Sequence, residues 1–71
     1  MNKFYVCETE SMQSVITQQH YNEITAGSLK AAKITATHSQ FFKNTVLRIF
    51  DENKNELSYK KDGKWYDTWN L

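Results

Sequence analysis

The side chains that could take part in catalysis are few and scattered along this 71-residue chain. His20 and His38 stand without a recognisable partner motif, and no phosphate-binding loop, dinucleotide fingerprint or catalytic-triad pattern is present. Four carboxylates fall in predicted turns or at strand ends: Asp51, Glu52, Asp62 and Asp67. Acidic residues in such places are typically solvated rather than paired for acid–base chemistry. We therefore expect a protein that is not an enzyme and that uses no cofactor.

The single cysteine, Cys7, cannot form an intramolecular disulfide, and no Cys/His cluster has zinc-ligand spacing. It lies in the β-favouring stretch "KFYVCET", so we expect it to pack as a small hydrophobic residue rather than act as a nucleophile. An unpaired cysteine fits a reducing compartment. No stretch has the features of a signal peptide or a membrane span. The expected location is the cytoplasm.

Charge is unevenly distributed although the net charge is only +1. Residues 1–23 sum to −2 (one lysine, three glutamates), residues 24–50 to +4 (four cations, no carboxylate) and residues 51–71 to −1 (four lysines, five carboxylates). This distribution excludes an acidic mimic of DNA and indicates one basic face. The candidate cations for that face are Lys30, Lys33, Lys43, Arg48 and Lys60. They suit phosphates or an acidic protein surface, and an ordinary solvated helix face is the alternative.

Local patterns predict one helix and five strands. The strands are expected over residues 3–9, 21–26, 45–51, 56–61 and 64–69. Ser28 follows Gly27 and is well placed to cap a helix over residues 29–40, whereas residues 10–22 form a polar loop with room for one helical turn. Asp62-Gly63 predicts a type I′ hairpin turn. The expected fold is a single α+β domain over residues 1–71, in the order β-β-α-β-β-β, with a single helix on one face of a four- to five-stranded antiparallel sheet.

The helix is expected to have an apolar side and a basic side. At 100° per residue, Leu29, Ala32 and Ala36 form a narrow stripe that suits close packing on a sheet. The adjoining arc holds Lys30, Lys33, Ile34 and Thr37, with His38 at its edge. Phe41 or Phe42 is then expected to close the core.

Period-two alternation is expected to sort the strand residues between the two faces of the sheet. Leu47 and Ile49 share one face with Leu57 and Tyr59, which leaves Arg48, Ser58 and Lys60 on the other. The aromatic residues near the C-terminus are Trp65, Tyr66 and Trp69. Such residues can stack on bases, but packing in the core or along an edge strand is their commoner role.

Three stretches carry a further pattern: A-x-S-L-x-x-A-K-x-x-A over residues 26–36, Q-x-F-x-x-T-V-x-R-I over residues 40–49 and Y-K-x-D-G-K-W over residues 59–65. With them, residues 23–67 resemble small phage-encoded anti-CRISPR proteins that inhibit type I-F systems. The resemblance implies a protein that acts in the cytoplasm of a bacterial host cell. There it would bind the guide-RNA-bearing surveillance complex, against the backbone subunits that hold the RNA, and block pairing with target DNA. The implied partner-binding residues are Lys30, Lys33, Ile34, Thr37, His38, Gln40 and Lys60. Ile34 and His38 depart from the family, which has basic residues there.

Three other functions fit the same residues. The chain could be a nucleic-acid-binding module, a phage protein of this fold directed at another defence complex such as type I-E, or a structural or regulatory prophage product without inhibitory activity. Weak contact with nucleic acid is expected at most, and no membrane partner. The charged residues of "ELSYKKDGK" discourage pairing of sheet edges, so a monomer is expected.

Overall fold

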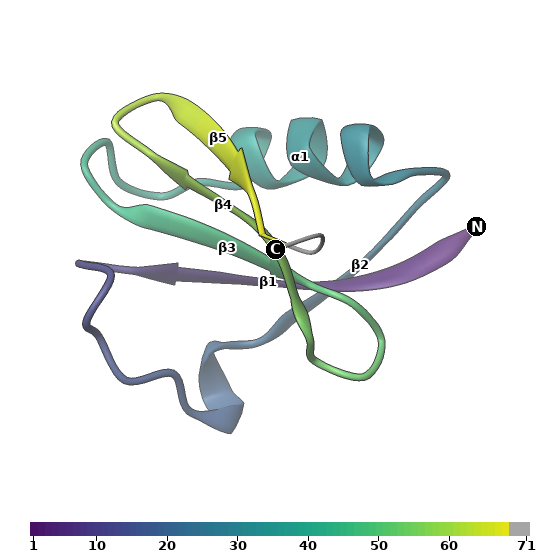
Figure 1. The fold of residues 1–71 in the computed structure, drawn as a ribbon, viewed down its shortest axis with the longest axis horizontal. Coiled ribbons are helices and arrows are strands. Elements are labelled where there is room, and N and C mark those ends of the chain that lie inside the picture. Colours follow the sequence, from purple (N-terminus) through teal and green to yellow (C-terminus); the bar gives the residue numbers. More distant parts are fainter. Residues whose placement is uncertain (69–71) are drawn as a thin grey trace.

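The computed structural model describes residues 1–68, in which one helix lies on a five-stranded antiparallel sheet (Figure 1). The strands are β1 (Asn2–Thr9), β2 (Asn22–Ala26), β3 (Val46–Phe50), β4 (Glu56–Lys61) and β5 (Lys64–Asp67), and the helix is α1 (Leu29–His38). A short 3-10 turn, η1 (Gln18–His20), interrupts the loop before β2. The strand order is β2-β1-β3-β4-β5. The predicted α+β fold and the order β-β-α-β-β-β are confirmed, while Trp69 lies outside the described residues.

The helix begins where the sequence predicted and ends two residues earlier. The Ser28 hydroxyl accepts a hydrogen bond from the Ala31 N–H at 3.1 Å, as an N-cap residue does. At the other end, the Ser39 N–H donates to the carbonyls of Thr35 and Ala36, and the Ser39 hydroxyl also donates to the Thr35 carbonyl. The Gln40 N–H donates to the Thr37 carbonyl at 3.3 Å, and these bonds close the last turn of α1, so Gln40 lies just beyond the helix.

The core lies between α1 and the sheet. Ala32 and Ala36 are buried there, and Leu29 packs against the same cluster, which confirms the predicted stripe. The sheet contributes Phe4, Val6, Ala26, Leu47 and Ile49. Small residues on the buried side allow the helix backbone to approach the sheet closely.

The prediction of which β4 side chains lie on each face of the sheet is wrong, because the strand is shifted by one residue relative to the predicted pairing. Ile49 is paired with Ser58, and Leu47 with Lys60, so Ser58 and Lys60 lie on the face that α1 covers. Arg48 is paired with Tyr59 on the opposite face. An irregularity between Ile49 and Phe50 shifts the register of this hairpin, and alternation counted along each strand separately does not detect such a shift. Leu57 is half-buried and contacts the core cluster, in line with its apolar character.

The predicted turn residues form turns. Asp62 and Gly63 have φ values of 54° and 78°, which confirms the type I′ prediction of positive φ at both central positions. Asp51 accepts hydrogen bonds from the N–H groups of Asn53 and Asn55, both at 2.9 Å, and so closes the β3–β4 connection. These two turns fix the β3–β4–β5 part of the sheet.

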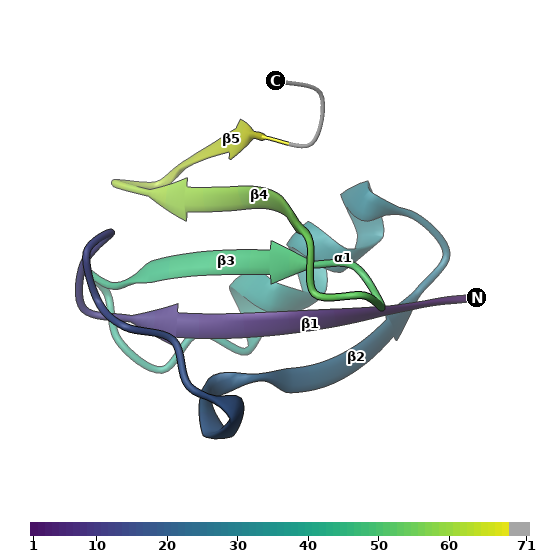
Figure 2. The ribbon, with the colours of Figure 1, turned by 60° about the horizontal axis from the view of Figure 1, so that its bottom comes forward.

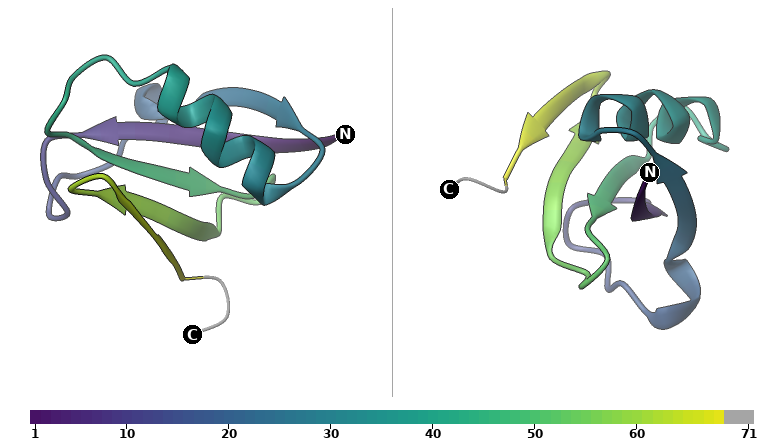
Figure 3. Two further views of the ribbon diagram at one scale, coloured as in Figure 1. Left: turned by 90° about the horizontal axis from the view of Figure 1, so that it is seen from above. Right: turned by 90° about the vertical axis from the view of Figure 1, so that its right-hand side faces the viewer.

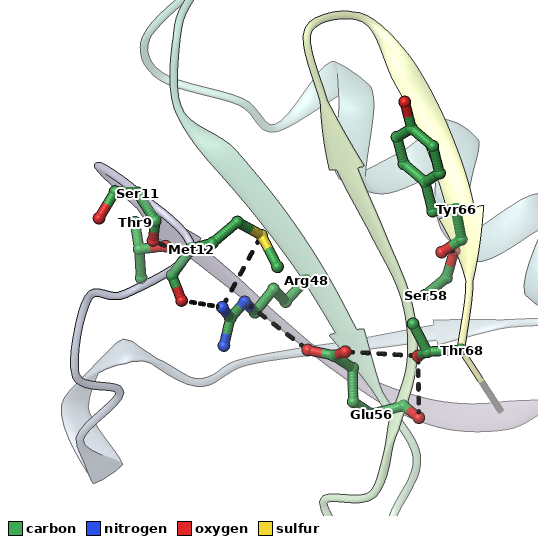
Figure 4. Close-up of polar contacts among 8 residues, drawn as sticks. All are labelled: Thr9, Ser11, Met12, Arg48, Glu56, Ser58, Tyr66 and Thr68. Atoms are coloured by element: carbon green, nitrogen blue, oxygen red, sulfur yellow. Dashed lines mark hydrogen bonds and ion pairs between the residues drawn. The ribbon is translucent and has the colours of Figure 1, made fainter. Parts of the chain in front are cut away.

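Residues 10–21 cross the sheet face opposite α1 (Figure 2). Arg48 holds this segment, because its guanidinium donates to the Met12 carbonyl and pairs with Glu56 at 3.6 Å (Figure 4). Cys7 is buried, as predicted, and burial raises the pKa of its thiol to about 11 although the Arg48 charge opposes the shift. Arg48 therefore stabilises the face opposite α1 and takes no part in a basic helix face.

Candidate protein-interaction surface

The ribbon views show α1 lying across the sheet near β5 (Figure 3). Side chains of these two elements line a shallow groove of about 320 Å³. It is lined by Lys30, Lys33, Ile34, Thr37 and His38 from the helix and by Trp65 from the strand. Lys60 adjoins it, since this residue is paired with Trp65 and its ammonium group donates to the Thr37 hydroxyl at 3.3 Å. We call these seven residues the lysine groove. The predicted partner-binding residues other than Gln40 are thus brought together.

Ser58 positions the strand that forms one wall of the lysine groove. Its side chain is completely buried, with the hydroxyl oxygen 2.8 Å from the Tyr66 carbonyl and 3.0 Å from an Asp67 carboxylate oxygen. The hydroxyl donates to one of these two acceptors at a time. The contact fastens β5 to β4 and keeps Trp65 beside the helix.

Lys33 has a partner inside the protein. Its ammonium group donates to the Asp67 carboxylate at 2.6 Å and lies 5.7 Å from the centre of the Trp65 ring. The hydrogen bond from Lys33, and then that from Ser58, lowers the pKa of the Asp67 carboxyl. Asp67 is half-exposed, in line with the predicted solvated residue, but its ion pair with Lys33 was not predicted. The sheet brings the Asp67 carboxylate next to Lys33, which lies 34 residues earlier in the sequence. Lys33 belongs to residues 24–50, a segment that contains no carboxylate of its own.

The remaining groups of the groove combine positive charge with apolar surface. Lys60 donates to Thr37, whose hydroxyl in turn donates to the Lys33 carbonyl at 2.9 Å, so the Lys60 side chain is held against the helix. Lys30 and His38 are exposed, and Ile34 presents half of its surface to solvent. Ammonium donors beside an apolar strip suit recognition of another surface by hydrogen bonding and contact rather than covalent chemistry.

Gln40 and Lys43 are not in the lysine groove. Lys43 is exposed in the loop that follows α1. The Gln40 amide donates to the Thr45 hydroxyl at 3.0 Å, and that hydroxyl donates to Glu8 at 2.6 Å. Gln40 therefore belongs to a second arrangement, on the other side of the helix terminus.

Glu8 organises this second arrangement, and sequence reasoning missed it. One carboxylate oxygen accepts from the Phe41 N–H at 2.8 Å and the other from the Phe42 N–H at 2.9 Å. Burial favours the neutral acid, but the hydrogen bonds from Phe41, Thr45 and Phe42 outweigh it and lower the pKa of Glu8. No local pattern reveals this contact, because Glu8 is the second-to-last residue of β1 and lies 33 residues before Phe41.

Phe41 and Phe42 do not close the core as predicted. Glu8 holds the backbone of both residues, and Phe41 is 83% exposed and Phe42 71% exposed. They border a hollow of about 450 Å³ that we call the phenylalanine hollow. Its lining residues are Glu8, Thr9, Glu10, Gln19, His20, Asn22, Phe41, Phe42 and Thr45.

Residues 1–68 contain no group of three or more His, Cys, Asp or Glu side chains that could hold a metal ion. No helix in this part of the chain is long and apolar enough to cross a membrane. His38 is exposed on α1, and the other histidine, His20, accepts a hydrogen bond from the Thr17 N–H at 2.9 Å.

The fold and the lysine groove define a small α+β protein with a lysine-lined groove beside α1. The solved structure of AcrIF9 is similar to this chain with a TM-score of 0.84 and 36% identical residues. The match covers 96% of this chain and 88% of AcrIF9. The chain therefore belongs to the AcrIF9 family, which confirms the resemblance to type I-F anti-CRISPR proteins seen in its sequence patterns. No protein-family model and no curated protein sequence matches the chain.

Proposed function

We propose that this protein inhibits a type I-F CRISPR system by docking its lysine groove on the guide-RNA-bearing surveillance complex. The observation that carries the proposal is the meeting of Lys33 and Lys60 in one groove of an AcrIF9-family protein. These two lysines come from elements far apart in sequence, and both match the pattern of the family. The contact is made with the backbone subunits that hold the guide RNA.

Inhibition follows from the bulk of the domain and needs no catalytic step. The folded chain measures 29 × 26 × 23 Å. At about 3.4 Å per nucleotide along a strand, a body 29 Å long covers roughly eight nucleotides of a guide. A protein seated on the subunits that hold the guide would therefore stand where target DNA must pair.

The charge of the groove favours docking on a chosen surface over general coating of nucleic acid. Subunits that hold RNA are basic, so the lysines must find carboxylates, backbone carbonyls or accessible phosphates on them. A net charge of +1 and the internal Lys33–Asp67 pair leave little charge for unspecific attraction. Complementarity of this kind contributes mainly to specificity and to the rate of association.

The test compares the same reversal of charge at two places, in the lysine groove and on the sheet face opposite α1. Lys33→Glu/Lys60→Glu should weaken binding to a purified type I-F surveillance complex at least 100-fold, because attraction becomes repulsion at two contacts. Lys61→Glu/Lys64→Glu is the matched control, since these lysines are paired on the sheet face opposite α1. Lys33→Gln/Lys60→Gln removes both positive charges without placing a carboxylate next to Asp67. This variant therefore tests the loss of charge with less risk of a folding defect.

Co-elution in size-exclusion chromatography and titration calorimetry give the affinities. Wild-type protein that fails to bind the complex would overturn the proposed function. Wild-type binding together with unchanged affinity of Lys33→Gln/Lys60→Gln would place the interface elsewhere on the domain.

Weak contact with nucleic acid is a second candidate, and it rests on the opposite sheet face. Tyr59 and Tyr66 are stacked with ring centres 5.0 Å apart, and the Lys64 ammonium lies 5.4 Å from the Tyr66 ring centre. Such a pair suits stacking on an unpaired base. The isolated protein should then bind single-stranded DNA weakly, with an affinity that falls as salt rises and that Lys61→Glu/Lys64→Glu abolishes. Absence of binding at low salt contradicts this candidate.

A further inference from the structure

The phenylalanine hollow presents an unusual combination of exposure and order. Large exposed aromatic side chains are the residues that most often anchor protein interfaces. Phe41 and Phe42 are adjacent in sequence and among the most exposed hydrophobic residues of the described chain. The connection that carries them is held by three hydrogen bonds to Glu8, so its backbone has a defined conformation.

This order matters because a rigid anchor loses little conformational freedom on binding. Thr45 links Glu8 to the Gln40 side chain, and the Gln40 N–H donates to the Thr37 carbonyl at 3.3 Å. The connection is thus tied both to the end of β1 and to the last turn of α1. The aromatic pair is presented by the fold and does not depend on a partner for its backbone position.

Acidic side chains lie beside the two aromatic rings of the hollow. Glu8 and Glu10 are among the residues lining the hollow, and neither lysine nor arginine is. A neighbouring depression shares Glu8, Thr9, Glu10 and His20 and adds Val15, which is also exposed. An aliphatic stem with a positive end fits such a surface, since the stem packs on apolar rings and the charge faces carboxylates or an aromatic face.

We infer that the phenylalanine hollow is a second anchor, which receives a lysine or arginine side chain of the protein partner. The identity of that partner as the surveillance complex rests on the proposed function, and subunits that hold RNA expose such side chains. His38 lines the lysine groove and Phe41 follows three residues later, a distance of about 11 Å at most. One partner surface can therefore contact both sides of the helix terminus, with carboxylates opposite the groove and a cation opposite the hollow.

Two sets of variants test this anchor. Phe41→Ala/Phe42→Ala should weaken binding to the purified surveillance complex about 30-fold, because both exposed aromatic rings are removed. Glu10→Lys should weaken binding about tenfold, and Glu52→Lys, an equal charge change in the exposed β3–β4 turn, should not. Unchanged affinity of both Phe41→Ala/Phe42→Ala and Glu10→Lys overturns the inference while leaving the proposed function intact.

A second measurement does not need the complex. N-acetyl-arginine amide is titrated into isotopically labelled protein, and the amide resonances are followed by NMR. We expect shifts at Glu10, Phe41 and Phe42 that disappear in Phe41→Ala/Phe42→Ala. Absence of these shifts in a protein that also fails to bind the complex overturns both the proposed function and the anchor. Self-association of the free protein that the phenylalanine variant abolishes also overturns the inference, because the occupant is then a second copy of the chain.

Discussion

The lysine groove and the phenylalanine hollow lie on either side of the end of α1 and differ in how they are built. In the groove, Lys33 pairs with Asp67 and Lys60 with Thr37, so part of the charge is already satisfied within the protein. In the hollow, the Glu8 carboxylate accepts hydrogen bonds from the backbone N–H groups of Phe41 and Phe42, and the aromatic side chains are left exposed. The groove therefore contributes mainly selectivity to an interaction, and the hollow offers apolar contact area that contributes affinity.

Combining the two sets of substitutions gives the largest expected effect. If both regions contact one partner, the losses of Lys33→Gln/Lys60→Gln and Phe41→Ala/Phe42→Ala should multiply, because separate contacts are additive in free energy to within about 0.5 kcal/mol. We expect a loss of about a thousandfold or more in affinity for the surveillance complex, measured by calorimetry or by competition. A quadruple variant no weaker than the worse double variant would show that only one region is in contact.

The two regions should also differ in how much they contribute to the free energy of unfolding. The contacts of Glu8 in the hollow should contribute more than the Lys33–Asp67 pair of the groove. Glu8→Ala removes three charge-assisted hydrogen bonds at once and should lower the free energy of unfolding by about 2 kcal/mol, measured by urea denaturation. Asp67→Asn weakens one ion pair in which the carboxylate is half-exposed, so its cost should stay below about 1 kcal/mol. Glu10→Ala is the control beside Glu8. Equal losses for Glu8→Ala and Asp67→Asn would contradict the difference drawn between the regions.

The smallest effect is a difference in pH dependence. Folding lowers the pKa of both Glu8 and Asp67 from ordinary values of 4.5 and 3.8, so the unfolded chain binds these protons more readily. Their contributions are complete above the ordinary pKa values and are lost as pH falls through the lowered ones. Glu8→Gln should flatten the fall of stability below about pH 4.5, and Asp67→Asn should act only at still lower pH. Thermal melts between pH 3 and 7 measure both slopes, and a wild-type stability independent of pH below 4.5 contradicts the account.

Features that depend on short sequence spacing were predicted well. The stripe of Leu29, Ala32 and Ala36, the Ser28 cap and the Asp62-Gly63 turn each follow from a few neighbouring residues, and together they define the fold. The arc of the lysine groove on α1 follows from the same helical periodicity. This is why the helical half of the candidate site could be named in advance.

Features that depend on pairing between distant residues were missed. Because of the register shift in the β3–β4 hairpin, the Lys60 side chain lies on the face of the sheet that α1 covers. This position completes the lysine groove. The Glu8 contact spans 33 residues and the Lys33–Asp67 contact 34, and neither leaves a trace in local composition. One of the two residues Phe41 and Phe42 was expected to close the core on hydrophobicity alone, whereas the hydrogen bonds to their backbone hold both at the surface.

The most direct test of the central claim is target-DNA binding by a type I-F surveillance complex in the presence of increasing amounts of this protein. We predict that wild-type protein added before the DNA abolishes target binding at near-stoichiometric amounts, that Lys61→Glu/Lys64→Glu does the same, and that Lys33→Gln/Lys60→Gln does not. Full target binding in the presence of excess wild-type protein would contradict the account.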